Sequence, residues 1–247
     1  ANLILSSIPN YEGTFWSDDY ASDLDSARGY GAVASNQSWG RPDYDGDNSA
    51  NANLNVTEAQ TWVTNYSGSF TQDEVLGFLG EGRYSTAGAN LNAQTTAWLD
   101  WIDALDDFQN SGVVVFANGN KLGEADASFV AGLPEFYTKL SEAWLSVTYA
   151  DFSGTSLGSA STSDFSLLGN PCGSTKQYCL TVDDYLIKGA SHVSGGVSQY
   201  KDNDAGSSYG APMVAGGIAL LAQAFPNHTP EQLTDRVLAS ANNNWFT

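Results

Sequence analysis

The sequence predicts a single α/β domain in three layers, with a mainly parallel sheet flanked by helices. Short apolar runs of strand length alternate with segments whose apolar residues recur at helical spacing, as in chains that connect parallel strands through crossover helices. The run at 112–117 is β-branched and apolar almost throughout, which is typical of a strand buried on both faces. With 247 residues and 42% hydrophobic content, the chain is long enough for one sizeable core, so we assign residues 1–247 to one domain.

The first half of the chain supplies two expected strands and two expected helices. Residues 1–8 and 32–37 are short apolar runs that predict strands, and residues 18–29 between them predict a helix with a polar face. Residues 41–57 are rich in Asp, Asn, Gly and Ser, a composition that indicates a loop. Residues 95–108 carry apolar residues at helical spacing and predict a helix.

The second half continues the alternation of strands and helices. Residues 143–149 and 179–182 follow the buried run at 112–117 as further expected strands. Residues 213–225 continue a helix, and residues 229–241 predict the last one. The last segment begins with a threonine, a proline and, three residues after the threonine, a glutamine, which is the pattern of a capped helix start.

The charge of the chain excludes several classes of partner. A net charge of −19, from 28 acidic and 9 basic residues, opposes the electrostatic attraction that drives binding to nucleic acids and anionic lipids. No run of about 18 apolar residues occurs, so no membrane-spanning segment is expected in this chain. The chain starts at Ala1 without an initiator methionine or a basic leader region, so we expect an internal piece of a longer protein.

Cys172 and Cys179 are the only cysteines, and they lie close together between turn-rich segments. A local disulfide is the simplest interpretation, and it indicates an oxidising compartment. Two free buried thiols or half of a zinc site are the alternatives. The zinc site is disfavoured because both histidines are remote.

The segment 204–217 is the most informative stretch, because it combines a hydroxyl group with the start of a helix. Gly206 and the neighbouring small residues allow a tight turn, and Pro212 fits only the first turn of a helix because it lacks an N–H. Ser208 is therefore expected where unpaired N–H groups and the positive end of the helix dipole favour developing negative charge. A serine in this position is suited to acyl transfer.

Two families of enzymes place a serine in such a turn, and chain order separates them. Residues 206–210 satisfy the G-x-S-x-G pattern of α/β-hydrolases. In that fold an acid and then a histidine follow the serine, whereas here His228 precedes Asp235 and little chain remains. The α/β-hydrolase interpretation is therefore rejected.

The segment instead resembles the serine signature of subtilisin-like proteases, G-T-S-x-A-x-P-x-V-A-G, whose serine comes last among the catalytic residues. Ser207 replaces the usual Thr, and Tyr209 and Gly210 replace Met and Ala. The resemblance implies a subtilisin-like three-layer fold, here incomplete at both ends, with Ser208 as the nucleophile. The matching residues are Gly206, Ser208, Ala211, Pro212, Val214, Ala215 and Gly216.

A second resemblance concerns residues 113–120, Val-Val-Val-Phe-Ala-Asn-Gly-Asn, which are similar to the subtilase strand V-V-V-x-A-A-G-N. It implies that the side-chain amide of Asn120 and the backbone N–H of Ser208 bind the oxyanion of the tetrahedral intermediate. The alternative for this segment is a core strand followed by an Asn-Gly turn.

Residues 34–40 are similar to the family's strand that ends in N-x-S-hydrophobic-G. In the family the exposed backbone there pairs with an extended peptide as an added strand. The alternative for the tryptophan of this segment is a side chain that only packs into the core at a strand end. The substrate-binding residues implied are Ser38, Trp39 and Gly40 on one side and Ala117, Asn118 and Gly119 on the other.

The chain lacks the base and the acid that such a serine needs. In the family, an Asp in a D-[ST]-G setting and a His in H-G-T both precede the serine. His192 lacks that context and His228 follows the serine, so we assign catalysis to neither. Residues 1–4 resemble the strand that follows the helix of the catalytic His. The partner expected for this chain is therefore the missing N-terminal segment of the same protein.

The segment with Asp43, Asp45 and Asp47 has carboxylates at alternate positions, the spacing used by loops that wrap calcium. It lacks a demonstrable Glu for the last ligand position, and acidic loops are common in a chain of this charge. Calcium is thus only a candidate for a stabilising role. The expected chemistry requires no cofactor, and no metal site is assigned.

The sequence therefore predicts a secreted or cell-surface serine endopeptidase that cleaves polypeptides through an acyl-enzyme on Ser208. The first alternative is a non-catalytic peptide-binding fragment or pseudoprotease that keeps the groove for an extended peptide. The second is an esterase that uses the same serine. Residues 1–247 alone are expected to hydrolyse little or nothing.

Overall fold

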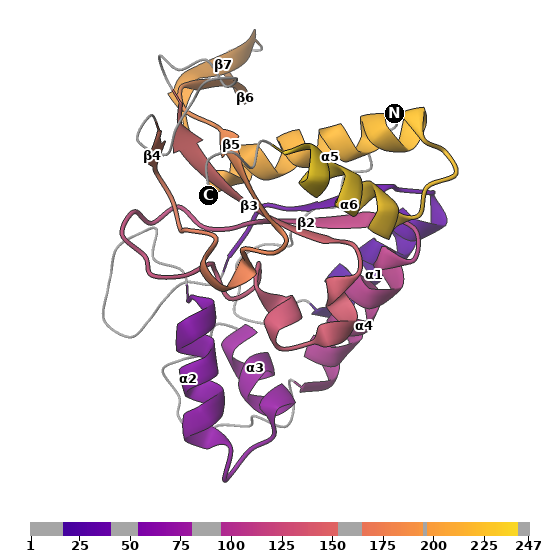
Figure 1. The fold of residues 1–247 in the computed structure, drawn as a ribbon, viewed down its shortest axis with the longest axis vertical. Helices are drawn as coiled ribbons and strands as arrows, with labels where there is room; N and C mark the ends of the chain where they lie inside the picture. The colour runs from indigo at the N-terminus through magenta and orange to yellow at the C-terminus, as the bar shows by residue number, and fades with distance from the viewer. Residues whose placement is uncertain (1–16, 41–53, 81–94, 153–164, 195–196, 242–247) are drawn as a thin grey trace.

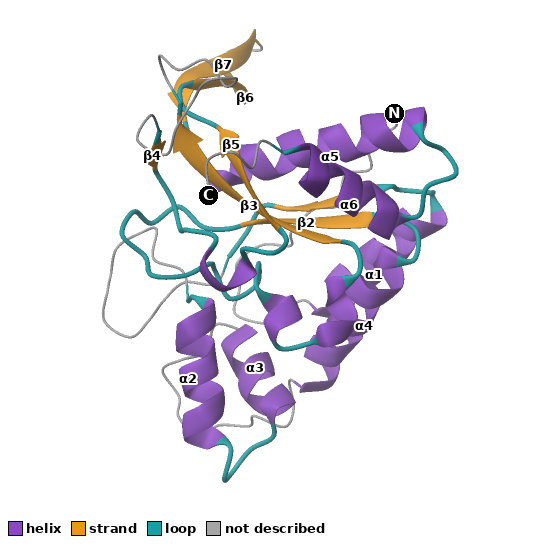
Figure 2. Ribbon diagram, viewed as in Figure 1, coloured by secondary structure: helices purple, strands orange, loops and turns teal. Residues whose placement is uncertain are grey.

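A mixed, mostly parallel sheet lies between two layers of helices in the computed structural model, which describes residues 17–40, 54–80, 95–152, 165–194 and 197–241 (Figures 1 and 2). Strand β1 pairs with β2 and β2 pairs with β3, both in parallel, and β5 extends β3 in parallel on its far side. A short strand, β4, adds to β3 in the antiparallel direction. The strands are β1 (Ala34–Gln37), β2 (Val113–Ala117), β3 (Trp144–Asp151), β4 (Ser166–Leu167) and β5 (Cys179–Asp183).

The helices divide between the two faces of the sheet. Helices α1 and α4 cover one face, and α5 and α6 cover the other, while α3 packs against α4 and α2 against α3 (Figure 2). These helices are α1 (Ser17–Gly29), α2 (Val56–Tyr66), α3 (Gln72–Gly80), α4 (Thr95–Gln109), α5 (Ser207–Ala224) and α6 (Pro230–Ser240). Single 3₁₀ turns lie at Leu133–Glu135, Thr138–Ser141 and Gly173–Thr175.

The core is aromatic on one face of the sheet and aliphatic on the other. Side chains alternate along β2, so that Phe116 joins the cluster on the α4 side, where it stacks on Trp144 with ring centroids 4.9 Å apart. Val113 and Val115 join the opposite cluster, which includes Ala211 and Ile218 of α5. Every residue of β2 is buried, which is the consequence of two-sided packing that its β-branched composition predicts.

Most of the predicted elements are confirmed, with ends that shift by a few residues. The expected strands 32–37, 112–117, 143–149 and 179–182 correspond to β1, β2, β3 and β5. The expected helices 18–29, 95–108 and 229–241 correspond to α1, α4 and α6, and the expected helix 213–225 is the later part of α5. Helix α6 begins as predicted, with Thr229 and Gln232 forming a reciprocal capping box and Pro230 in the first turn. The expected strand 1–8 lies outside the described residues.

One expectation about the chain is wrong, and two helices, the short strand β4 and a hairpin were missed. The expected loop 41–57 ends early, because α2 starts at Val56, where Asn55 and Glu58 form a capping box; residues 41–53 lie outside the described part. Helix α3 and the hairpin of β6 (Ile187–Ser194) and β7 (Val197–Asp204) were not expected either. Among the described residues, no helix has the length and apolar character needed to cross a bilayer.

The disulfide between Cys172 and Cys179 is present and closes a short loop before β5. Inside this loop, Ser174 donates its N–H and its hydroxyl to Asp126, at 2.7 and 2.8 Å. The hydroxyl of Thr57 in α2 donates at 2.7 Å to Oδ2 of the same carboxylate, the oxygen that also accepts the Ser174 hydroxyl. Asp126 thus joins α2 to the disulfide loop.

We expect removal of the disulfide to destabilise the fold without changing its topology. A double Cys172→Ser, Cys179→Ser variant should lose about 2–3 kcal/mol of unfolding free energy, because closing so short a loop restricts the unfolded chain only modestly. Denaturant unfolding of both proteins at the same pH measures the difference. Two alkylatable thiols in the native wild-type protein would contradict the disulfide.

Candidate active site

Ser208 is the second residue of α5, and the start of this helix lies beside the residues that follow β1 and β2. The residue before the helix, Gly206, has φ +152° and ψ +145°, a backbone conformation that only glycine adopts readily. This turn brings the chain out of β7 and directly into α5. Ser208 is half-buried, and its backbone N–H is one of the first N–H groups of the helix, which have no partner within it.

Ser208 also makes a direct contact with the end of β1. The Ser38 hydroxyl donates to the backbone carbonyl of Ser208 at 3.1 Å, and the Ser208 hydroxyl lies 3.5 Å from the carbonyl oxygen of Ser38. Two segments that are 170 residues apart in sequence therefore meet at the predicted nucleophile. The structure brings Ser38 and Ser208 together, as the resemblance implies.

Asn120 lies on the other side of the same turn, and Ser207 fixes its orientation. The Asn120 Oδ1 atom accepts hydrogen bonds from the Ser207 N–H at 2.8 Å and from the Ser207 hydroxyl at 2.9 Å. A backbone N–H can only donate, so the atom that faces Ser207 must be the amide oxygen. The amide nitrogen of Asn120 is therefore on the side away from Ser207.

Ser207 is a site residue that the sequence reasoning missed. Its hydroxyl also accepts the N–H of Gly119 at 3.1 Å, and the residue is almost fully buried. A hydroxyl at this position, where the family signature has threonine, was the available signal. Ser207 therefore links the start of α5 to two consecutive residues of the loop after β2.

The loop formed by Ala117, Asn118 and Gly119 is buried and already bonded within the chain. The N–H and carbonyl of Asn118 pair with Val147 and Ser128, and Gly119 has φ +110° with the Asn170 amide closer than a Cβ would allow. The Gly119 carbonyl also accepts the N–H of Asn170 at 3.2 Å. The backbone of 118–119 is thus not open for pairing with an added strand, which leaves these residues as a wall of the site.

Trp39 places its side chain in the core. Its ring lies 5.6 Å from Tyr20 and 5.4 Å from Trp101, and its Nε1–H donates to the Gln37 side chain at 2.8 Å. The Trp39 side chain therefore packs into the core at the end of β1, as the alternative interpretation of this segment expected. A role of the Ser38–Gly40 backbone in binding a peptide stays a prediction.

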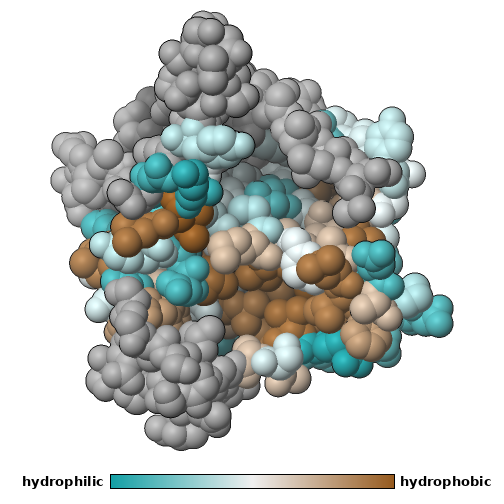
Figure 3. Space-filling view, turned by 90° about the horizontal axis from the view of Figure 1, so that it is seen from above, coloured by the Kyte–Doolittle hydropathy of each residue, from teal (hydrophilic) through white to brown (hydrophobic). Residues whose placement is uncertain are grey.

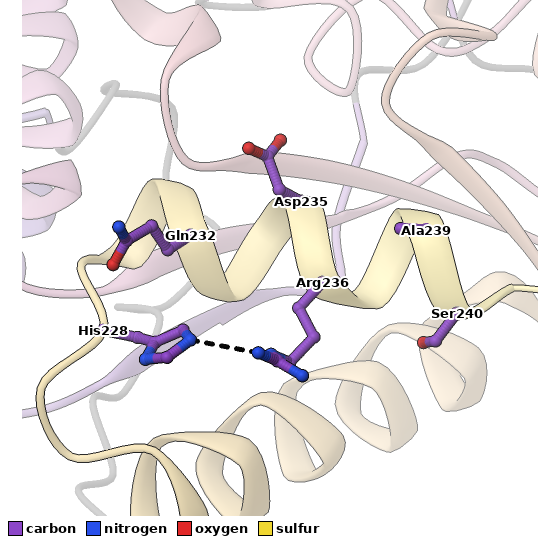
Figure 4. Close-up of a pocket in the computed structure, with 6 residues that line it drawn as sticks. All are labelled: His228, Gln232, Asp235, Arg236, Ala239 and Ser240. Carbon is purple, nitrogen blue, oxygen red and sulfur yellow. Dashed lines mark hydrogen bonds between the residues drawn. The ribbon is translucent and has the colours of Figure 1, made fainter.

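Neither histidine side chain is described near Ser208. His228 lies beyond the end of α5, about 27 Å of helix away, where its Nε2 is 3.2 Å from Arg236 (Figure 4). It lines an open hollow of about 510 Å³ on the outer side of α6. The side chain of His192 lies outside the described part. The described hydrogen bonds give the Ser208 hydroxyl one partner, the Ser38 carbonyl.

No group of three or more His, Cys, Asp or Glu residues in the described part of the chain is arranged to hold a metal ion. Asp43, Asp45 and Asp47, the candidate calcium loop, lie outside the described residues. Calcium binding by this loop stays a prediction.

Two buried carboxyl groups, those of Asp184 and Asp126, have pKa values that are shifted in opposite directions. Burial raises the pKa of Asp184 to about 6, and the N–H groups of Gly210 and Gly206 offset only part of that rise. Burial also raises the pKa of Asp126, but hydrogen bonds from Ser174, Thr57 and Ala127 outweigh it and hold that pKa below its ordinary value. The difference lies in the hydrogen bonds each carboxylate accepts.

Comparison with known proteins gives one family and one fold. The model of the "Subtilase family" matches residues 1–246. Two solved structures with a similar fold are those titled "Prenylagaramide maturation protease PagA" (14% identity, 95% of this chain, 61% of that chain, TM-score 0.51) and the "self-cleaved protease domain of PatA" (20%, 92%, 60%, TM-score 0.50). This chain therefore spans about three fifths of their length. A search of curated proteins found no match.

We expect an Asp184→Asn variant to be more stable than the wild type at neutral pH. Because the folded-state pKa of about 6 exceeds the ordinary Asp value of 3.8, the favourable contribution of Asp184 is complete below 3.8 and is lost as pH rises through about 6. The variant should therefore gain about 1–3 kcal/mol near pH 7.5 and nothing near pH 4. Denaturant unfolding at both pH values measures this gain.

An Asp126→Asn variant is the matched control, with the opposite sign. The lowered pKa of Asp126 means that its contribution is present at neutral pH and is lost as pH falls through the folded-state value. This variant should be less stable than the wild type near pH 7.5. A loss of stability in both variants at neutral pH would show that the fold does not raise the pKa of Asp184.

Proposed function

Since this chain belongs to the subtilase family, we propose that it is the serine-bearing part of an endopeptidase that hydrolyses peptide bonds through an acyl-enzyme on Ser208. The observation that carries the proposal is the meeting of three segments at the first turn of α5, where Asn120 bonds to Ser207 and Ser38 bonds to Ser208. The first turn of α5 holds Ser208, the loop after β2 holds Asn120, and the end of β1 holds Ser38. These segments are distant in sequence, and a packing role alone does not require them to converge on a serine.

The chemistry follows from the places of these groups. The Ser208 oxygen attacks the carbonyl carbon of the substrate, and its proton passes to a histidine base as the bond forms. Negative charge then develops on the carbonyl oxygen, where the Ser208 N–H and the amide nitrogen of Asn120 are the proposed donors. The same histidine returns the proton to the leaving amine, and a water molecule then hydrolyses the ester.

The histidine and its partner Asp come from sequence outside residues 1–247 in this proposal. The outer side of α5 supports it, because this helix is apolar on all sides yet exposes Met213 by 50% and Leu220 by 69%. On the same side, no atom lies within 4 Å of a Cβ built on Gly216 or Gly217. The view from above shows apolar side chains gathered on the side of the molecule that carries α5 (Figure 3). We propose that the segment with the base covers this face.

The remaining features fit a polypeptide substrate and an oxidising compartment. Strand β1 is the first strand of the described sheet, so Ser38, Trp39 and Gly40 follow an edge that can accept an extended peptide. The Cys172–Cys179 disulfide supports a secreted or cell-surface location, where such bonds persist.

We expect Ser208→Ala to abolish peptide hydrolysis by the full-length protease and Asn120→Ala to lower kcat by about 100- to 1,000-fold with little change in KM. The loss follows from removal of the nucleophile in one case and of one oxyanion donor in the other. Steady-state kinetics on an unfolded protein substrate gives both values. Asn110→Ala, at an exposed amide at the end of α4, is the control and should be silent.

The same protein separates the alternative functions. A fluorophosphonate should label Ser208 in the wild type but not in Ser208→Ala, and a full-length protein that resists labelling would favour the peptide-binding alternative. Turnover of simple esters without turnover of any peptide would favour the esterase. Full-length protein with an intact upstream Asp and His that cleaves no unfolded protein would refute the protease.

We expect residues 1–247 alone to show little or no hydrolysis. We also expect that the Leu220→Glu variant of the full-length protease has lower turnover than the wild type. The charge lies on the apolar face of α5, where it would oppose docking of the segment with the base. Tyr30→Glu, at a residue 79% exposed at the end of α1, adds the same charge elsewhere and is the control. Turnover and thermal unfolding are compared; equal values for both variants would contradict the docking face.

A further inference from the structure

Asp184 is a buried carboxyl that the proposed mechanism does not use. It follows directly after β5, where its N–H bonds to the carbonyl of Ala150 at 3.3 Å, and its side chain is completely buried. Among the described residues, neither carboxylate oxygen has a hydrogen-bond partner of full geometry, and no cation forms an ion pair with it. Burying a carboxyl that has neither a hydrogen bond nor an ion pair is unfavourable, so the position of Asp184 calls for a functional explanation.

Asp184 lies beneath the first turn of α5, the turn that carries Ser208. A Cβ built on Gly210 would be 3.6 Å from Oδ2 of Asp184 and only 2.6 Å from a methyl group of Val182. Glycine at position 210 therefore lets the helix start sit directly on β5 and on the carboxyl. The N–H groups of Gly206 and Gly210 face Asp184 closely enough to lower its pKa, although burial dominates.

The charged and titratable groups around Asp184 are acidic or phenolic. Asp183 of β5 and Asp204 at the end of β7 both disfavour its ionisation. Tyr149 of β3 faces it, and the pKa of Tyr149 is raised by burial and by the charge of Asp184. From α5, Tyr209 donates its hydroxyl to Asp204. Several acidic side chains therefore lie on one side of the first turn of α5, and the proposed oxyanion site lies on the other side of that turn.

Two of the three departures from the family signature, Tyr209 and Gly210, lie at this acidic contact. Tyr209 binds Asp204, and Gly210 makes room for Val182 and Asp184, whereas the signature has Met and Ala at these positions. The departures and the acids thus form one structural unit. A Cβ at position 210 would lie 2.6 Å from a methyl group of Val182, so this contact depends on the glycine.

We propose that Asp184 is a positioning residue of the serine site: its carboxyl supports the first turn of α5 from below and, when ionised, competes with the oxyanion for the positive end of the helix. Like charges at the same helix terminus repel across a poorly polarisable interior. Loss of the Asp184 charge should therefore strengthen the electrostatic stabilisation of the oxyanion by the N-terminus of α5. This role presupposes the proposed protease function, because it acts through Ser208 and Asn120.

The test compares wild type, Asp184→Asn and Asp183→Asn in the full-length protease, with kcat and KM for one peptide followed from about pH 5 to about pH 9. Asp184→Asn keeps the shape and removes the charge, so its kcat near pH 8 should exceed the wild-type value by about tenfold. The ratio of the two kcat values should approach one near pH 5, where the Asp184 carboxyl of the wild type is mostly protonated and therefore as uncharged as the asparagine of the variant. Asp183→Asn removes an exposed charge next to it and should stay within about twofold of wild type throughout.

Several outcomes would overturn the inference. A ratio that is the same at every pH would indicate a purely structural role, as would a change confined to KM. A kcat of Asp184→Asn at or below the wild-type value near pH 8 would show that its charge does not oppose the reaction. Should Asp184→Asn not fold, Asp184→Ser, a smaller neutral residue, gives the same comparison.

A second measurement does not depend on turnover. Infrared difference spectra between about pH 5 and about pH 8 should contain a carboxyl band from a group sheltered from water, and this band should be missing in Asp184→Asn. A wild-type protein that hydrolyses no peptide would refute the protease function, and the infrared spectra would then decide the titration of Asp184 separately. Identical spectra from both proteins would overturn the inference whatever the turnover.

Discussion

The hydrogen bonds between Ser207 and the loop after β2 are the constraint on which the site depends. Through them the first residue of α5 is bonded to Gly119 and Asn120, 88 and 87 residues earlier in the chain. Helix α5 crosses the aliphatic face of the sheet, and its start must meet the carboxyl ends of the parallel strands. Two short hydrogen bonds to one amide oxygen fix both the place of that start and the direction in which the amide nitrogen points.

Local patterns made the regular elements predictable, and long-range contacts decided the rest. The β-branched run of β2 and the capping residues of α6 are local signals, and both elements form where expected. Helix α2 was missed although Asn55 and Glu58 form a capping box, because the stretch before it, rich in Asp and Asn, indicated a loop. The side chain of Trp39 packs among aromatic residues of α1 and α4, a contact that its own sequence neighbours do not encode. Ser207 and Asp184 act through partners in segments distant in sequence, so no local pattern could have assigned them.

Asp126 and Asp184 show how the same degree of burial gives opposite electrostatic results. Both are nearly or fully inaccessible to solvent, but Asp126 accepts hydrogen bonds from a 3₁₀ turn, from α2 and from its neighbour Ala127. It therefore remains charged and joins three segments of the fold. Asp184 is buried beside the helix start, further acids and Tyr149, so its ionisation is unfavourable. Asp126 therefore stabilises the scaffold of the site. Asp184, when ionised, places an uncompensated negative charge beneath the turn that carries Ser208.

Helix α5 thus carries two different demands along its length. Its first turn must present Ser208 while resting on Val182 and Asp184, which requires glycine at 210 and excludes the small side chain that the family signature has there. Beyond that turn the helix is apolar on all sides, with Gly216 and Gly217 leaving open space on the face turned away from the sheet. A helix of this composition is stable in water only when that face is covered. A segment that covers it would reach Ser208 along the same helix, so the surface that needs burial and the hydroxyl that needs a base lie on one element.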